Sequence, residues 1–292
     1  MIKDLDVLHL VTAGKPPVQS HDHVGGTMAA VRAWSARRLM ASLATAIGIL
    51  VTAGALSTVG AVGTAAGPAW GATALPRVDI YGDSVTWESE FFMVLALSHR
   101  ADVHMHVYPG AQICQWFSDM RSTAAAHPSM VIITEGLWGS RDCDHTSDLF
   151  REVQDDAGTA ATIFSQSRVV FSADPVVLNS TEFVQTMGSK NYPKLLAAFR
   201  KAASLHNNAT FNDAATSVAP KNAFVWTRPC LSNETSALGC SHGSIRVREP
   251  DGIHLCPVTP PQPGHCPTYS SGERRWAAAV TRPAVKAFAL RP

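Results

Sequence analysis

The sequence predicts an α/β domain built on a parallel sheet. Short apolar runs of strand length alternate with longer segments of helical periodicity from residue 78 to the end of the 292-residue chain. This alternation is typical of strand–helix–strand units, whose right-handed crossovers cover both faces of a parallel sheet. A hydrophobic content of 46% is enough for the core of one or two such domains.

Five segments have the character of buried strands, because each is short, apolar and followed by residues that favour turns. They are residues 78–81, 101–108, 130–134, 168–173 and 223–226. The second ends at Pro109-Gly110 and the fourth at Asp174-Pro175, so both strands stop where the chain must turn.

Five further segments have helical periodicity. They are residues 88–98, 113–126, 147–164, 192–206 and 270–290. We expect a bend at Pro283 in the last one, because proline removes a helical hydrogen bond. Residues 230–269 are different: they are rich in Pro, Gly, Cys and Ser and have little periodicity. Loops this long are usually functional or disordered, and we expect disulfides to staple this one.

The N-terminal quarter has the pattern of a secretory signal rather than of a folded domain. Residues 39–76 contain no charged residue, and Arg37 and Arg38 precede this apolar run. The small-residue sequence Ala72-Thr73-Ala74 favours cleavage after Ala74, which leaves residues 75–292 as the folded domain. The run is also long enough to span a bilayer, so an uncleaved signal anchor is the alternative for residues 1–74. Both predict a secreted or cell-envelope protein.

Charge and cysteine content narrow the function classes. The chain has 24 Lys and Arg residues against 23 Asp and Glu, without a basic block, which argues against nucleic acid as a partner. Six cysteines in an exported chain favour disulfides over zinc, because the sequence contains no C-x-x-C pair. They are Cys114, Cys143, Cys230, Cys240, Cys256 and Cys266. His104 and His106 share a strand face, and we favour a plain strand over a metal site.

Two stretches contain the residue types of nucleophilic catalysis. Gly-Asp-Ser follows the first predicted strand and ends at Ser84, and Asp-Gly-Ile-His lies in the long loop with Asp251 and His254. A serine hydroxyl becomes a good nucleophile when an imidazole takes its proton and a carboxylate orients that imidazole. Each stretch alone is equally a turn. Their placement, at the end of a strand and near the end of an α/β chain, favours a Ser-His-Asp triad.

The chain resembles the SGNH/GDSL hydrolase family, and in particular its exported, disulfide-containing actinobacterial branch. The matching stretches are Ile80-Tyr-Gly-Asp-Ser84, Tyr108-Pro-Gly110 and Arg248-Glu-Pro-Asp251-Gly-Ile-His254-Leu-Cys256-Pro. The resemblance runs from about residue 77 to the end. It implies a flavodoxin-like three-layer α/β/α sandwich with a five-stranded parallel sheet, which acts on esters without a cofactor or metal.

The resemblance also implies roles for individual residues. Ser84 would be the nucleophile, His254 the base and Asp251 its orienting partner. The backbone N–H groups of Ser84 and Gly110 would form the oxyanion hole, although Gly110 is equally a plain loop glycine. The family's third oxyanion donor is an asparagine, and Ser140 stands at the corresponding place here. A serine hydroxyl is shorter and less fixed, so we expect a weaker oxyanion hole.

Disulfide pairs follow from the strand order that the resemblance implies. The loops of Cys114 and Cys143 would flank the end of the first strand, so a bridge between these two would hold the oxyanion loops. The remaining cysteines would pair as Cys230–Cys240 and Cys256–Cys266 within the long loop.

Other side chains near the site leave alternatives open. Trp87, Trp116 and Trp138 are candidates for a substrate wall or for ordinary packing. For Arg141 and Arg248 we favour solvated surface charge over contact with an anionic substrate.

Three functions remain as predictions from the sequence. We favour an exported monomeric serine esterase that cleaves a small-molecule, lipid or acylated-glycan ester. An acyltransferase would use the same site, with a hydroxyl acceptor in place of water. The altered third oxyanion position motivates a third reading, a catalytically weak binding protein of the membrane or cell envelope.

Overall fold

The computed structural model describes residues 74–136, 148–178, 188–255 and 269–289, so the predicted signal segment lies outside it. Five parallel strands form one sheet in the order β2-β1-β3-β4-β5. Their bounds are β1 Arg77–Gly82, β2 Asp102–Val107, β3 Met130–Glu135, β4 Arg168–Ala173 and β5 Ala209–Phe211. The predicted parallel α/β fold is confirmed.

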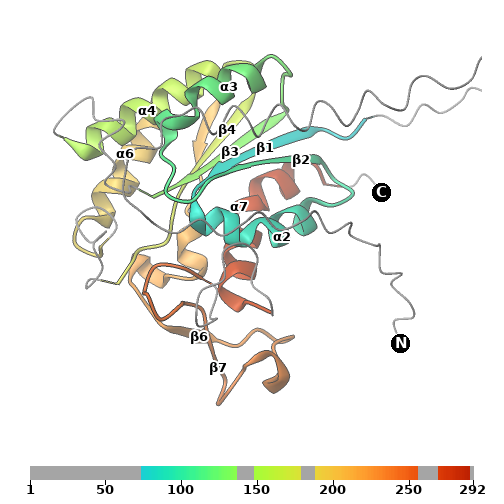
Figure 1. Cartoon of the computed structure of the whole chain (residues 1–292), viewed down its shortest axis with the longest axis vertical. Coiled ribbons are helices and arrows are strands. Elements are labelled where there is room, and N and C mark those ends of the chain that lie inside the picture. Colours follow the sequence, from blue (N-terminus) through green and yellow to red (C-terminus); the bar gives the residue numbers. More distant parts are fainter. Residues whose placement is uncertain (1–73, 137–147, 179–187, 256–268, 290–292) are drawn as a thin grey trace, which may run out of the picture. The chain divides into compact units, whose positions relative to one another are not determined.

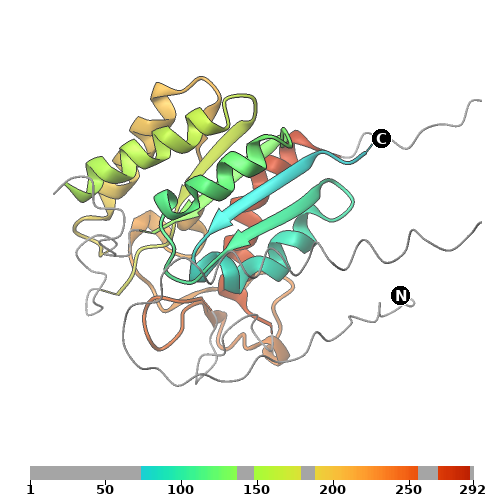
Figure 2. The same ribbon diagram turned by 45° about the horizontal axis from the view of Figure 1, so that its top comes forward.

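Helices cover both faces of this sheet, which gives the expected three layers (Figures 1 and 2). On one face α2 packs against α7, and the opposite face carries α3, α4 and α6. The helices are α2 Ser84–Leu97, α3 Phe117–Ala124, α4 Leu149–Ile163, α6 Tyr192–Leu205 and α7 Ser271–Ala287. The central strands β1 and β3 are almost entirely buried, because both of their faces are covered. No helix in the described part of the chain is long and apolar enough to cross a membrane.

The predicted fifth strand and the predicted start of the first helix were wrong. The fifth strand is Ala209–Phe211, and residues 223–226 form no strand. Residues 223–226 are at least partly exposed and lead instead into β6 (Thr227–Pro229), which pairs antiparallel with β7 (Ser244–Arg246) outside the main sheet. The other difference is α2, which begins four residues earlier than predicted, at Ser84 itself.

Short 3₁₀ turns complete the fold. They are η1 Ile113–Trp116, η3 Ala214–Ser217, η4 Pro220–Asn222 and η5 Ser236–Leu238. The first of these replaces the opening of the predicted helix 113–126, so that α3 starts only at residue 117. Proline 283 lies inside α7, which continues past it to Ala287.

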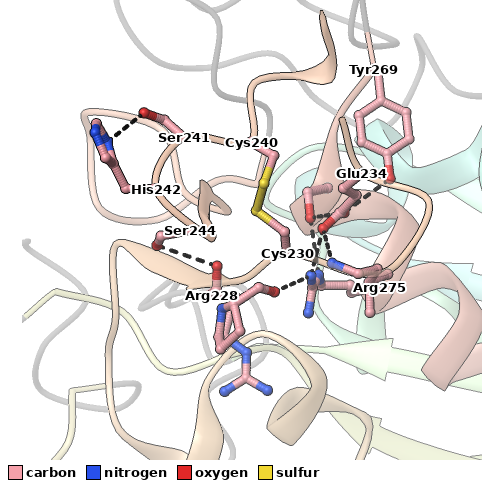
Figure 3. Close-up of a disulfide and its surroundings, with 12 residues drawn as sticks. Arg228, Cys230, Glu234, Cys240, Ser241, His242, Ser244, Tyr269 and Arg275 are labelled. Carbon is pink, nitrogen blue, oxygen red and sulfur yellow. Dashed lines mark hydrogen bonds and ion pairs between the residues drawn. A yellow bond between two sulfur atoms is a disulfide. The ribbon is translucent and has the colours of Figure 1, made fainter. Parts of the chain in front are cut away.

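A disulfide closes part of the long loop on itself, and a buried glutamate holds the loop against α7 (Figure 3). Cys230 and Cys240 form the expected bridge, with a Cα–Cα distance of 6.0 Å. Between them, Glu234 accepts a hydrogen bond from Tyr269 Oη at 3.0 Å and is paired with Arg275 at 2.8 Å. Since Arg275 lies on α7, the ion pair anchors the loop to this helix, while the disulfide constrains the loop internally.

A polar network lies beside the predicted strand histidines. His106, in β2, hydrogen-bonds Asp79 of β1 at 2.8 Å through Nε2 and Asp119 of α3 at 2.7 Å through Nδ1. His104 also lies in β2 and contacts Asp102 at 3.0 Å. The imidazole of His106 stacks on Tyr81 with a centroid distance of 4.3 Å. His106 therefore ties the edge strand to its neighbour and to the covering helix.

This network makes stability depend on pH. Burial lowers the pKa of His106, but hydrogen bonds to Asp119 and Asp79 outweigh it and raise the pKa above 6.5. The charged imidazole therefore stabilises the fold fully below about pH 6.5, and this contribution is lost as pH rises through the raised pKa. Burial raises the pKa values of the two aspartates, but their hydrogen-bonding partners lower them below 3.8. The contribution of the ionised aspartates to stability is therefore present above pH 3.8 and is lost as the pH falls through their lowered pKa values.

Candidate active site

Helix α2 begins where β1 ends, at the point where the strand order changes direction (Figure 1). Ser84 is the first residue of this helix. The preceding Gly82 has no room for a side chain, because an added Cβ would lie 2.6 Å from Thr134 Oγ1. Asp83 then caps α2 by accepting a hydrogen bond from the Val85 N–H at 3.0 Å. Gly82 and Asp83 together produce the sharp strand-to-helix turn that presents Ser84.

The structure brings Ser84, His254 and Asp251 together in a hydrogen-bonded series. His254 Nε2 lies 3.0 Å from Ser84 Oγ, and His254 Nδ1 lies 2.6 Å from Asp251 Oδ2. These are the contacts that a nucleophile, its base and an orienting carboxylate require. Ser84 comes from α2, which we call the serine helix. The other two come from residues 247–255 after β7, which we call the histidine loop.

The histidine loop is shaped by its own sequence. Asp251 Oδ1 accepts hydrogen bonds from the backbone N–H groups of Ile253 at 2.8 Å and His254 at 3.1 Å. Gly252 has φ +73°, and an added Cβ would lie 2.5 Å from the Cβ of Leu178. A glycine at this position therefore permits both the left-handed turn and the close packing. These backbone hydrogen bonds therefore hold the Asp251 carboxylate in the position from which it contacts the imidazole.

Arg248 also stabilises the histidine loop. The prediction that this side chain is solvated was wrong. Its side chain is fully buried. Nη1 donates to the carbonyl of Ile253 at 2.8 Å and Nη2 to the carbonyl of Val176 at 2.7 Å. The guanidinium also lies 5.4 Å from the ring centroid of Phe224. Arg248 thus joins the residue before His254 to the segment after β4.

The charge state of the histidine follows from its surroundings. Burial lowers the pKa of His254, but the hydrogen bond to Asp251 and the charges of Glu88, Asp251 and Glu249 raise it to about 9. For Asp251, burial raises the pKa, and the hydrogen bond from His254 together with two backbone N–H groups lowers it below 3.8. Asp251 is therefore ionised at neutral pH and stabilises a protonated imidazole.

Carboxyl groups are also buried beneath the serine turn. Asp174 and Glu135 are fully buried near Asp83. Burial, and then the charge of Asp83, raises the pKa of each of them well above its ordinary value. The neutral form of both carboxyl groups is therefore favoured beneath the turn. Nothing in the sequence pattern marks Glu135 or Asp174 as part of the site.

The predicted oxyanion donors are only partly described. Tyr108 N–H donates to the Gly82 carbonyl at 3.2 Å, so the loop after β2 lies beside the end of β1. Gly110 in that loop is exposed and has φ +74°. Among the described residues, no group accepts a hydrogen bond from the backbone N–H of Ser84 or of Gly110. Ser140 lies outside the described residues.

Several other predicted residues have plain outcomes. Cys114 is disulfide-bonded, but Cys143, Cys256 and Cys266 lie outside the described residues, so its predicted pairing stays a prediction. Trp116 packs edge-on against Tyr81, with ring centroids 5.7 Å apart, which is a packing role. Trp87 is half-buried on α2. Trp138 and Arg141 lie outside the described residues.

A metal is not needed to explain the carboxylates near His254. Glu249, Asp251 and His254 have ligand atoms within 4.8 Å of one another. Both ring nitrogens of His254 are already hydrogen-bonded, Nδ1 to Asp251 and Nε2 to Ser84. A metal at this position would have to displace one of these contacts, and we assign none.

Comparison with known proteins supports the fold. No family model and no curated protein sequence matches the chain. Among solved structures, the lipase/acylhydrolase from Enterococcus faecalis superposes with a TM-score of 0.51 at 14% identity, covering 74% of this chain and 99% of that one. The catalytic domain of peptidoglycan O-acetyltransferase A from Streptococcus pneumoniae gives a TM-score of 0.46 at 13% identity, covering 73% and 94%. The family 3 carbohydrate esterase from Clostridium thermocellum gives 0.44 at 12%, covering 74% and 100%. The chain therefore shares its fold with the lipase/acylhydrolase from Enterococcus faecalis.

Proposed function

We propose that this protein is an exported serine esterase of the SGNH/GDSL type. The observation that carries the proposal is the series from Ser84 Oγ through both nitrogens of His254 to Asp251, with contacts of 3.0 and 2.6 Å. Its position at the end of β1, where open α/β sheets place their chemistry, supports it further. The fold shared with a lipase/acylhydrolase agrees with an ester substrate.

The geometry suits a two-step acyl transfer. Ser84 Oγ attacks the ester carbonyl while its proton passes to His254 Nε2, and Asp251 stabilises the imidazolium through Nδ1. The proton then moves to the leaving alcohol, and an acyl-serine remains. Water attacks this acyl group, gives a proton to Nε2, and the acid leaves as the proton returns to Ser84. The backbone N–H groups of Ser84 and Gly110 are the donors we assign to the oxyanion in both steps.

This mechanism requires His254 to be neutral before the attack. Because the pKa of His254 is raised to about 9, we expect the reaction rate to rise with pH through the alkaline range. A hydroxyl acceptor would replace water in an acyltransferase without any change in the first step. The acceptor is therefore tested separately, by comparing acid release with ester formation when a glycan or lipid alcohol is added.

The first test is covalent labelling of the oxidised full chain with a fluorophosphonate probe. We expect labelling of the wild type and loss of labelling in Ser84→Ala and His254→Gln. Ser122→Ala is the matched control, because Ser122 is exposed on α3 and hydrogen-bonds only the carbonyl one turn earlier. Absence of labelling in the folded wild type would contradict the proposal and favour a binding protein. Labelling that survives in Ser84→Ala would equally contradict it.

A further inference from the structure

We propose that Glu88 is a positioning residue of this site, which ties the serine helix to the histidine loop and uses its carboxylate charge to set the basicity of His254. The inference rests on the proposed function, because it concerns the base of that reaction. Nothing in the Gly-Asp-Ser or Asp-Gly-Ile-His stretches indicates this residue.

Glu88 stands one helical turn after Ser84 on α2, so the two side chains project from the same side of the helix. The side chain is buried, with 7% of the residue exposed. Its Oε2 accepts a hydrogen bond from the backbone N–H of Leu255 at 3.3 Å. Leu255 directly follows His254, so a single helical turn and a single hydrogen bond join the nucleophile to its base.

The other side of Leu255 is held as well. Ser270 Oγ, at the start of α7, donates to the Leu255 carbonyl at 2.9 Å and also caps α7 through Glu273 N–H. Leu255 itself is fully buried. The backbone that carries His254 is therefore fixed between α2 and α7, which pack against each other. Glu88 supplies the contact on the α2 side.

Charge gives Glu88 a second effect. The groups that face His254 are Asp251 and Glu249 from its own loop and Glu88 from α2. From α7, Glu273 interacts with both Glu88 and Glu249. Burial raises the pKa of Glu88 to about 8, with the charge of His254 opposing and that of Glu249 adding to the rise. Burial likewise raises the pKa of Glu249 to about 7 and that of Glu273 to about 9.

The consequence is a coupled ionisation within the pH range in which His254 titrates. Once Glu88 is ionised, its negative charge favours the protonated imidazole and delays the release of the proton. Removal of this charge should let His254 become neutral at a lower pH. A residue that only supported the loop would change the stability or the maximal rate, but it would not move this titration.

Three substitutions separate the hydrogen bond from the charge. Glu88→Gln keeps an oxygen that can accept from Leu255 N–H and removes the charge. Glu88→Asp keeps the charge on a side chain one methylene shorter, which weakens the hydrogen bond. Glu90→Gln is the matched control, because Glu90 lies on the same helix and is only partly buried.

The test is an NMR titration of the full chain in detergent micelles with ¹³C-labelled histidine. The His254 signal is assigned from its loss in His254→Gln. We expect Glu88→Gln to lower the His254 midpoint by roughly one pH unit, with Glu88→Asp and Glu90→Gln close to the wild type. An unchanged midpoint in Glu88→Gln would overturn the proposal. The wild-type curve gives a second check if that variant does not fold: a His254 titration without an inflection at the Glu88 midpoint would also overturn it.

Fluorophosphonate labelling across pH gives the functional readout. Glu88→Gln should shift the rise in labelling rate to lower pH and keep its plateau, whereas Glu88→Asp should keep the midpoint and lower the plateau. A wild type that is never labelled refutes the esterase, but the NMR titration still decides the role of Glu88. The two failures are therefore distinguishable.

Discussion

Replacement of Arg248 by methionine should separate stability from reactivity. The arginine is fully buried and donates to the carbonyls of Ile253 and Val176, at 2.8 and 2.7 Å. Methionine fills much of the same volume and donates to neither carbonyl. The turn that carries His254 then loses the contact that fixes it to the segment after β4.

Two opposing contributions determine the change in the free energy of unfolding. Each buried carbonyl left without a donor costs about 1–3 kcal/mol, or about 4 kcal/mol for the pair. Burial lowers the pKa of Arg248 to about 10, well below the ordinary value of a guanidinium. The buried charge therefore costs about 3 kcal/mol, which the substitution removes. The net loss is about 1 kcal/mol, and we expect the melting temperature to fall by about 2–4 °C.

Reactivity should change far more than stability. A displacement of about 1 Å in a catalytic group can cost about 10²-fold, so we expect a loss of this size in the fluorophosphonate labelling rate. Arg248→Lys is the informative companion, because a lysine keeps the buried charge but lacks the planar fork that reaches two carbonyls. It should be no more stable than the methionine variant and equally slow. Wild-type labelling in either variant would refute the reasoning.

Three further predictions follow from contacts outside the catalytic series. His106→Gln should lower the melting temperature at about pH 5.5 and have much less effect at about pH 9, because only the charged imidazole stabilises the aspartates it contacts; a loss independent of pH in thermal scans would contradict this. Gly252→Ala should destabilise the chain by about 1 kcal/mol or more and slow labelling, because its positive φ and contact with Leu178 leave no room for Cβ; unchanged denaturant midpoints would count against it. Joint replacement of Cys230 and Cys240 by serine should lower the free energy of unfolding by about 2–3 kcal/mol, as expected for the short loop they close, and an unchanged urea midpoint would show that Glu234 alone anchors the loop.

The sequence predicted the sheet well where burial determines residue type. Strands β1, β3 and β4 are covered on both faces, so they appear as mainly apolar runs with predictable ends. Strand β5 is only three residues long, at the edge, and a strand that short leaves no detectable pattern. Residues 223–226 are apolar for another reason. Phe224 and Trp226 pack on each other, and the guanidinium groups of Arg248 and Arg246 lie over their respective rings.

The site was predictable only as far as local motifs and topology reach. The position of Ser84 follows from a parallel sheet in which a helix comes directly after β1, and the Asp251–His254 turn was indicated by its local motif. Glu88 was not predictable, because its role depends on the rotation of α2 and on a loop 167 residues away. Arg248 was misplaced because a buried charge is unusual, and here two backbone carbonyls stabilise it.

The hydrogen bond between Ser84 and His254 joins residues 170 positions apart. Ser84 emerges early in synthesis, and His254 follows only after all five strands of the main sheet have been made. Closure of so long a segment is entropically costly, so this contact is expected to form late in folding. Fragments that end before residue 254 contain the serine without its base and should be unreactive. Labelling of Ser84 would therefore report that the chain has completed its fold.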